Sequence, residues 1–451
     1  MEELDLVVVG AGWYGLAAAK QYREINPEHS IAIVDYASSI GGVWAEHRLY
    51  PGLKSNNLWG TYEYPDFPMD PSVFGIQPRQ HPTGQALHAY LTAYAKKFGF
   101  FDNVHCGVCV LSAEHLEDGG WILTVRSVTN SDPQEPQGEE SRMFARKLVL
   151  ATGMTSEPFL PRIKGQADFD RPLFHIKDLL KYADATTSKS VRRMTVLGGS
   201  KSAWDAVYAY GRKGIPVDWV IRAITNTFWH VLGSDVITLN GYDSHPEMAK
   251  LKPWTSAMFT ASTFSILNYD TDFLSSSVTA AFDSDDQITP DTALSPPLLY
   301  HFIAPVSPRF LRTRDFAFAG GIMNFSAAIC AHIQGLWIAA YFDGKLVRDP
   351  TAGISTSGPS QRSEPASLSL EDIQYETILY NRFGRWRYPA DHGAKFPDFV
   401  FDVVPYMDVM MADLGLQVHR KGGWFKEITD PYGPEDYVDI NDEWRRKFAE
   451  K

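Results

Sequence analysis

The feature that most constrains the fold is a glycine-rich turn near the N-terminus, between an apolar strand and a helix. Residues 4–9 (LDLVVV) are an apolar, β-branched run typical of a buried strand, and Gly10-Ala11-Gly12-Trp13-Tyr14-Gly15 follows it. The next residues favour a helix, and a second apolar run at 31–34 (IAIV) ends at Asp35. This order of strand, GxGxxG, helix, strand and acid predicts a dinucleotide-binding βαβ unit.

The three glycines and the aspartate of this unit each have a physical reason to occupy their positions. Gly10 permits the tight turn, Gly12 lets the backbone approach a pyrophosphate, and Gly15 lets the helix pack close to the strand. The helix N-terminus offers free N–H groups and the positive end of its dipole to phosphates. Asp35 lies 20 residues after Gly15, so we expect it to accept hydrogen bonds from a ribose.

A second unit of the same kind is predicted from residue 194 onwards. A strand at 194–197 (MTVL) leads into Gly198-Gly199-Ser200-Lys201-Ser202-Ala203, a helical stretch and the strand VDWVI, which is followed by Arg222. Ser200 and Ala203 replace two glycines, but both are small enough for close approach. An arginine at the end of the second strand accommodates a ribose 2′-phosphate, which an acid would repel. Arg222, with Lys201 as a second cation, therefore favours NADPH over NADH.

Composition and charge exclude several other classes of protein. The chain has 451 residues and a net charge of −12, whereas nucleic-acid binders normally present a basic face. Three cysteines fit a reducing compartment and no disulfide scaffold. Acids stand where a secretory signal needs basic residues, and the apolar stretch 327–342 is shorter than the roughly 18 residues of a membrane span. We expect a soluble, cytoplasmic protein without nucleic-acid or membrane partners.

The motifs around these two units resemble a known family. They are Gly41-Gly42-Val43-Trp44, the stretch YPGLKSNNLWGTYEYPDFPMD at 50–70, LVLATG at 148–153 and DFAFAGG at 315–321. Together they are similar to the flavin-containing monooxygenases, whose relatives include Baeyer–Villiger enzymes. The resemblance implies an α/β fold of two Rossmann-like domains, with the NADPH domain inserted in the FAD domain. It also implies NADPH- and O2-dependent insertion of one oxygen atom into a small organic substrate through a hydroperoxyflavin.

The same resemblance, added to the glycine motifs, predicts the residues that bind the two cofactors. For FAD these are Gly10, Gly12, Trp13, Tyr14, Gly15, Asp35, Gly42, Val43, Trp44, Asn57, Ala151, Thr152, Gly153, Gly320 and Gly321; for NADPH they are Gly198, Ser200, Lys201, Ser202 and Arg222.

One amide carries the prediction of reaction type. In the family, N- and S-oxygenating members have an Asn about ten residues before the aromatic-x-Asp-Phe-Pro stretch, and Baeyer–Villiger members have an Asp at the fourth position after YPG. Both counts lead to Asn56 in this sequence. An amide cannot act as a base, but it can donate and accept hydrogen bonds and so hold a neutral hydroperoxide. Asn56 therefore favours N- or S-oxygenation, including N-hydroxylation in secondary metabolism.

Three alternatives remain open at this stage. A Baeyer–Villiger enzyme acting on a ketone or aldehyde is one, although its signature is eroded here, with Arg171 in a glycine position and His175 retained. No arginine lies between Arg222 and Arg309 to stabilise a peroxide anion, which leaves Arg309, Arg312 and Arg314 as substitutes. A flavin oxidase or reductase without oxygenation and a non-enzymatic flavoprotein are the others.

The chain is expected to divide into three segments. Residues 1–160 carry the first part of the FAD-binding domain, 161–310 the NADPH-binding domain and 311–451 the second part of the FAD domain with a C-terminal tail. The segment 225–300, rich in Ser, Thr and aromatic residues, is predicted to be a substrate-side insertion, with contacts from Phe228, Trp229 and Trp254. The stretches 131–141 and 350–368 are predicted loops. The oligomeric state, a homodimer among the options, stays open.

Overall fold

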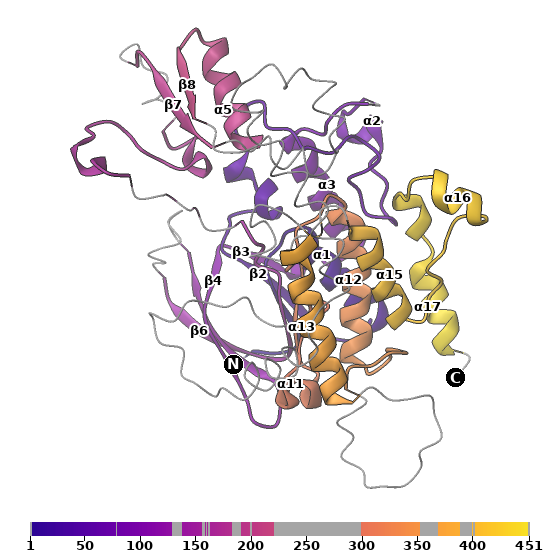
Figure 1. The fold of residues 1–451 in the computed structure, drawn as a ribbon. Coiled ribbons are helices and arrows are strands. Elements are labelled where there is room, and N and C mark those ends of the chain that lie inside the picture. Colours follow the sequence, from indigo (N-terminus) through magenta and orange to yellow (C-terminus); the bar gives the residue numbers. More distant parts are fainter. Residues whose placement is uncertain are drawn as a thin grey trace.

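A computed structural model provides the structure of the protein. It describes residues 2–77, 79–128, 138–155, 158, 160, 163–182, 191–198, 201–220, 299–351, 369–387, 399 and 402–449. The described residues build one large mixed sheet with helices packed against it and a smaller strand–helix–strand unit beside it (Figure 1). The strand order in the large sheet is β3-β2-β1-β6-β5-β4, with β11 also paired to β6.

The centre of the large sheet is parallel. It consists of β1 (Glu2–Val9), β2 (Ile31–Asp35), the second half of β6 (Glu140–Leu150) and β11 (Phe316–Phe318). The registers Val9 to Val34, Val9 to Leu150 and Phe318 to Leu150 show that these strands end level with one another. All five residues of β2 are buried, as expected for a parallel strand covered on both faces.

An antiparallel extension completes the large sheet. The strands β4 (Val108–His115) and β5 (Trp121–Ser127) form a hairpin, and β5 pairs with the first half of β6. The predicted loop at 131–141 is wrong at its end, because Glu140 already begins β6 and pairs with Arg126. Residues 129–137 lie outside the described residues. On the opposite edge, β3 (Val104–Cys106) pairs with β2.

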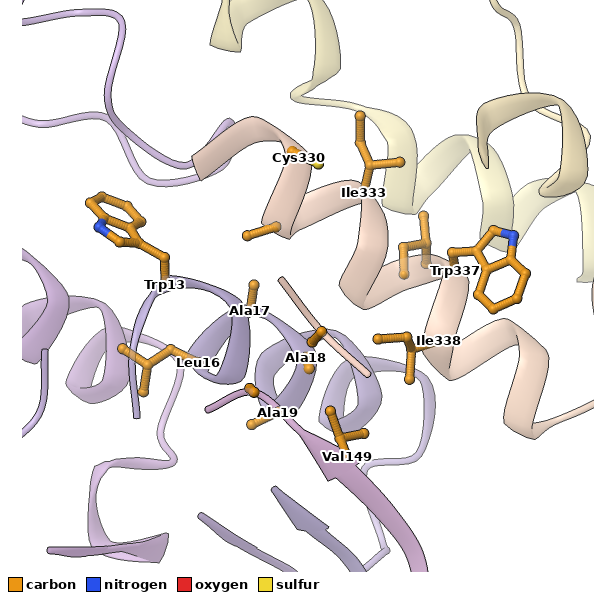
Figure 2. Packing of buried hydrophobic residues seen from close by; sticks show 14 of the residues in the cluster. Trp13, Leu16, Ala17, Ala18, Ala19, Val149, Cys330, Ile333, Trp337 and Ile338 are labelled. Atoms are coloured by element: carbon orange, nitrogen blue, oxygen red, sulfur yellow. The ribbon is translucent and has the colours of Figure 1, made fainter. Parts of the chain in front are cut away.

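Small residues let two helices approach closely over the sheet. α1 (Trp13–Ile25) packs against α12 (Ala327–Phe342), and Figure 2 shows Ala17 and Ala18 between the two helices. A Cβ added at Gly335 would lie only 2.8 Å from the carbonyl oxygen of Ala17, so this contact requires glycine. α12 is the apolar stretch that sequence analysis considered too short to span a membrane. Its residues 328–342 are all buried within the protein.

The remaining helices lie around this core. α3 (Gly84–Lys97) packs against α1, and α15 (Val403–Asp413) packs against α12. In Figure 1, α12, α13 and α15 lie together on the sheet and the C-terminal α17 lies at the outer edge. The other described helices are α2 (Pro71–Phe74), α11 (Pro308–Thr313), α13 (Leu370–Arg387), α16 (Trp424–Thr429) and α17 (Ile440–Ala449), with short 3-10 turns at Gly42–Trp44, Glu46–Arg48, Phe101–Asn103, Gln166–Asp168, Ile176–Asp178 and Pro434–Tyr437.

The smaller unit interrupts the large one in the chain. β7 (Met194–Leu197), α5 (Lys201–Arg212) and β8 (Val217–Val220) form it, and β7 pairs with β8 in parallel. The chain then returns through β9 (Leu299–Tyr300) and β10 (Ala304–Pro305) to β11, beside β6. The proposed insertion at 225–300 lies outside the described residues except at its end, as does most of the predicted loop at 350–368. The exact domain boundaries stay predictions.

Candidate dinucleotide sites and the loop between them

The carboxyl ends of the parallel strands define the first site. Gly10 follows β1, Asp35 ends β2, Ala151 follows β6, and Ala319 follows β11. Hydrogen bonds join these ends: the Gly10 amide donates to Val34 (2.8 Å), the Ala151 amide to Val9 (2.8 Å) and the Ala319 amide to Leu150 (2.8 Å). In open α/β sheets, ligands bind in the crevice outside these ends.

The glycine turn after β1 is as tight as the sequence predicts. Gly10 has φ = +112°, and a Cβ there would lie 2.3 Å from the Ala151 carbonyl oxygen. A Cβ on Gly15 would lie 1.9 Å from the Gly10 carbonyl oxygen, and one on Gly42 would lie 3.1 Å from the Cα of Gly12. No side chain caps the N-terminus of α1, and its first turn has no acidic residue. The first amides of α1 therefore remain available for a phosphate group.

Asp35 is buried beside this turn, where its carboxylate already holds the backbone. One oxygen accepts the Ala11 amide (2.7 Å) and the other accepts the Ala37 amide (2.8 Å). Its contact with a ribose stays a prediction. Arg48, which sequence analysis missed, lies next to this end of β2, because its guanidinium donates to the hydroxyl of Tyr36 (2.9 Å). The buried Nε of Arg48 has no hydrogen-bond partner among the described residues, so this group could bind a polar ligand.

The aromatic residues of the first motif lie in different environments. The ring of Trp13 packs against Tyr62 and Tyr64 with ring centroids 4.6 and 4.8 Å apart, so its side chain belongs to the core. Trp44 is also buried, and its Nε1 donates to the hydroxyl of Tyr62 (3.4 Å). Val43 is exposed. The rings of Trp13 and Trp44 therefore both contribute to the core around Tyr62.

One further turn follows β6, and another, after β11, packs against Tyr14. The hydroxyl of Tyr14 accepts a hydrogen bond from Asn324 (2.9 Å), and a Cβ on Gly320 would lie 2.6 Å from the Tyr14 ring. The Gly320 amide donates to the side-chain oxygen of Gln334 (2.9 Å), which fixes the turn after β11. Gly321 follows in this turn. After β6 come Ala151, which is buried, Thr152, and Gly153 with φ = +73°. The predicted FAD residues of β1, β6 and β11 thus meet at one edge.

A loop carries both candidate amides to this edge. The side chain of Asn57 donates to the carbonyl oxygen of Phe325 (2.8 Å), in the segment after Gly320 and Gly321. The backbone oxygen of Asn57 accepts from the Ser55 hydroxyl (2.6 Å). Asn56 is exposed, and its side chain makes no hydrogen bond within the described residues. The structure therefore places Asn57 in a structural bond and leaves the Asn56 amide free to contact a ligand.

The second site has the predicted strand and helix but a different charge arrangement. The Gly198 amide donates to Val220 (3.0 Å) across β7 and β8, and Gly198 has φ = +122°. The ammonium of Lys201 pairs with Asp205 one turn later in α5, and Ser202 lies beside it. Ser200 and Arg222 fall outside the described residues. The binding of NADPH by these residues stays a prediction.

The substitute arginines lie at the wrong edge of the sheet. Arg309 and Arg312 are in α11, which precedes β11, and Arg314 comes just before that strand. They therefore flank the amino end of β11, whereas the glycine turns lie at its carboxyl end. Arg314 is also paired with Asp349 (3.0 Å), and Arg309 donates to the carbonyl oxygen of His115 (2.8 Å). A cavity of about 540 Å³ between His115, Arg309 and Arg312 belongs to this amino edge as well.

A buried cluster of charged side chains, which the sequence did not predict, lies where α1 meets α12. Lys20 pairs with Asp66 and with Glu24 (2.9 Å), and Nδ1 of His332 lies 3.6 Å from the Asp66 carboxylate. Burial lowers the pKa of His332 to about 4. Burial would raise the pKa of Asp66, but the attraction of His332 and Lys20 outweighs it and holds this pKa below its ordinary value. The cluster joins α1, α12 and the stretch 62–67.

The cysteines do not form a redox pair in the structure. Cys106 ends β3, and Cys109 lies in β4 after a break at Gly107, which has φ = +72°. Cys106, Cys109 and Cys330 are all free, and burial raises the pKa of the Cys106 thiol to about 11. Across the described residues, no group of His, Cys, Asp and Glu has the arrangement of a metal site, and no helix is long and apolar enough to cross a membrane.

Two βαβ units with glycine turns at the carboxyl ends of their strands define the class: a two-domain, dinucleotide-binding α/β protein. The profile of the pyridine nucleotide-disulphide oxidoreductase family matches residues 4–225. The FAD-dependent monooxygenase resA of Aspergillus sclerotiorum is 26% identical, with 98% of each chain covered. An FAD-dependent monooxygenase of Pyrenophora dematioidea is 41% identical over 48% of this chain and 39% of its own.

A solved structure agrees with this fold over the whole chain. The S-allyl-L-cysteine S-oxygenase from Allium sativum superposes with a TM-score of 0.58 at 16% identity, covering 100% of this chain and 99% of its own. At that identity the match shows the fold alone. The sequence matches therefore give residues 4–225 as a pyridine nucleotide-disulphide oxidoreductase domain, and the relatives that match nearly the whole chain are FAD-dependent monooxygenases.

Proposed function

We propose that the protein is an NADPH- and O2-dependent FAD monooxygenase that oxygenates a nitrogen or sulfur atom of a small molecule. FAD would occupy the crevice at the carboxyl ends of β1, β2, β6 and β11, and NADPH the corresponding carboxyl ends of β7 and β8. The tight glycine turn, the uncapped start of α1 and the unpartnered Nε of Arg48 fit the first cofactor. Bound flavin supplies the chemistry of oxygen activation, and the chain supplies binding and orientation.

The observation that supports this reaction type is the position of Asn56. The bond from Asn57 to Phe325 holds the loop against the turn after β11, and Asn56 precedes it with an unengaged amide. An amide offers hydrogen bonds without removing a proton, which suits an electrophilic oxygen donor. Arg309, Arg312 and Arg314 lie at the opposite edge, which argues against their use in a Baeyer–Villiger reaction.

A rapid-mixing experiment tests the proposal without knowledge of the substrate. Purified enzyme is reduced with NADPH or NADH in the absence of O2 and is then mixed with O2 while its absorbance spectrum is recorded. We expect faster reduction by NADPH and an absorbing species that persists before oxidised flavin returns. Immediate reoxidation with stoichiometric H2O2 would support the oxidase alternative, and a colourless protein would contradict the whole proposal.

Variants of Asn56 then separate the reaction types. Asn56→Ala should shorten the lifetime of the oxygen-reactive species by about tenfold, because the hydrogen bond that we propose between the Asn56 amide and this species is lost. Lys54→Ala serves as the control, because Lys54 is exposed in the same loop. A panel of amines, thioethers and ketones identifies the product class. Esters formed from ketones would favour the Baeyer–Villiger alternative over ours.

The cellular setting is part of the same proposal. We propose a cytoplasmic enzyme of secondary metabolism that acts on a small-molecule substrate with O2, without nucleic-acid or membrane partners. Support comes from the acidic composition of the chain and from its fungal monooxygenase relatives. Sedimentation of the purified protein would decide whether it forms a homodimer.

A further inference from the structure

Tyr50 links the loop of Asn56 to the second βαβ unit, which we propose binds NADPH. The hydroxyl of Tyr50 donates a 2.6 Å hydrogen bond to the carboxylate of Asp205 in α5. Tyr50 lies six residues before Asn56, at the start of the loop that Asn57 holds against Phe325. The stretch 50–57 is therefore attached at one end to the second βαβ unit and at the other end to the turn after β11.

Asp205 has two partners that compete for the same oxygen. Both the Tyr50 hydroxyl and the Lys201 ammonium contact Oδ2 of Asp205. All three side chains are partly buried, so these interactions are stronger than they would be on the open surface. Burial and the Asp205 hydrogen bond raise the pKa of Tyr50 well above its usual range, so the phenol remains a proton donor.

Lys201 is the first residue of α5, and the sequence pattern assigned it, together with Arg222, to the 2′-phosphate of NADPH. A phosphate that attracts the Lys201 ammonium would draw it away from Asp205. Of these two partners, the Asp205 carboxylate would then keep the Tyr50 hydroxyl. Because the carboxylate would have lost the Lys201 ammonium, its hydrogen bond from Tyr50 would become stronger.

We infer that Tyr50 and Asp205 are positioning residues that couple binding of a 2′-phosphorylated nicotinamide dinucleotide at Lys201 to the seating of α5 against the Asn56 loop. This inference rests on the proposed function, because it assumes that the second site binds NADPH. The coupling is reciprocal: if the cofactor strengthens the Tyr50–Asp205 bond, the bond strengthens binding of the cofactor by the same factor. NAD⁺ lacks the 2′-phosphate and should not engage this coupling.

Calorimetric titration of the FAD-loaded protein with NADP⁺ and, separately, with NAD⁺ tests the inference without turnover. Tyr50→Phe keeps the ring and removes the hydroxyl, and it should weaken NADP⁺ binding by about five- to tenfold, at the lower end of the range typical of coupling between two sites. NAD⁺ binding should not change. Tyr208→Phe is the matched control, because Tyr208 lies on the same helix with 66% of its surface exposed.

Asp205→Asn tests the same coupling from the other side. It removes the charge that competes for Lys201, so NADP⁺ should bind more tightly than to the wild type. In this background Tyr50→Phe should have no further effect on NADP⁺ binding, because the coupled charge is gone. Hydrogen exchange of the peptide 201–212 in the cofactor-free protein should be faster in both single variants if the contact holds α5.

The outcomes separate the inference from the function on which it rests. Tyr50→Phe with wild-type NADP⁺ affinity would overturn the inference, as would an equal loss of NADP⁺ and NAD⁺ binding, which indicates a merely structural role. Should Tyr50→Phe not fold, weaker or unchanged NADP⁺ binding by Asp205→Asn would overturn it equally. A wild-type protein that does not distinguish NADP⁺ from NAD⁺ would instead contradict the proposed NADPH site.

Discussion

The two βαβ units follow the same plan but are packed to very different degrees. In the first, α1 is buried along most of its length, and a Cβ at Gly10 or Gly15 would lie within 2.3 Å of a carbonyl oxygen. In the second, Ala203, Ala206 and Tyr210 are the buried residues of α5, and a Cβ at Gly198 would meet no atom within 4 Å. Within the part of the chain that the structure describes, the first unit is thus part of the core, whereas α5 of the second is mostly exposed and contacts the loop before Asn56 through Asp205 and Tyr50.

The largest expected effect comes from filling the tight turn of the first unit. Gly15→Ala would place a Cβ 1.9 Å from the Gly10 carbonyl oxygen. We therefore expect the free energy of unfolding to fall by at least about 4 kcal/mol and the purified protein to lose its flavin. Gly198→Ala is the control in the second unit. It faces open space and meets only the strain of φ = +122°, about 1–2 kcal/mol. Thermal unfolding and flavin content measure both, and equal losses would remove the contrast.

The buried charge cluster should give the first unit a distinct pH dependence. Because burial holds His332 neutral, with a pKa of about 4 against 6.5 for the free group, the unfolded chain takes up a proton more readily between these values. Stability is therefore fully present above pH 6.5 and is lost as the pH falls towards 4, by about 3 kcal/mol for such a shift. Urea unfolding across this range measures the loss.

Two variants test the origin of this pH dependence. His332→Asn retains a polar group beside Asp66 and Gln21 but cannot take up the proton, so its stability should vary less between pH 6.5 and 4. His105→Asn, at an exposed position, should behave as the wild type does. A slope in His332→Asn as steep as in the wild type would assign the effect to other groups.

Helix packing provides a third comparison between the units. Gly335→Ala adds a Cβ 2.8 Å from the Ala17 carbonyl oxygen, where α12 meets α1, and should cost about 1–3 kcal/mol. Gly211→Ala in α5 meets no atom within 4 Å and should stabilise the protein by about 0.5–1 kcal/mol through higher helix propensity. Thermal unfolding of the two variants should therefore shift in opposite directions. A stabilised Gly335→Ala would show that the α1–α12 contact tolerates expansion.

The smallest effect concerns cofactor preference in the second unit. Arg222→Ala should raise the KM for NADPH at least about tenfold, or about 1.4 kcal/mol, by removing a charge-assisted contact to the 2′-phosphate. The KM for NADH should change little. Arg212→Ala, at the exposed end of α5, is the control for a general loss of positive charge. An unchanged KM for NADPH in Arg222→Ala would remove Arg222 from the site.

Much of the fold follows from patterns within short stretches of chain. The apolar runs before Gly10 and Gly198 correctly predicted β1 and β7, because a buried strand followed by a glycine turn and a helix has a local signature. The runs at 31–34, 148–153 and 315–321 likewise predicted β2, the end of β6 and β11. The error at 131–141 lay at a boundary, where polar residues at the start of a strand resemble a loop.

The site was predictable only in part, because short stretches of sequence do not show which distant residues meet. The spacing of the motif was enough to predict the tight turn at Gly10, the close packing at Gly15 and the position of Asp35 at the end of β2. Tyr50 lay within a quoted motif, but its partner Asp205 is 155 residues away. The pairing of Lys201 with Asp205 is an i,i+4 contact that a helix pattern could have revealed.

Local chemistry, then, decided that this chain has two glycine-turn βαβ units, with an acid at the end of the second strand of the first unit. Tertiary structure decided which distant groups meet: His332 with Asp66, Asn57 with Phe325, Tyr50 with Asp205, and three arginines at the edge remote from the glycine turns. Backbone propensity and hydrophobic period act over a few residues, whereas these contacts depend on how the whole sheet and its helices pack, which no short pattern encodes.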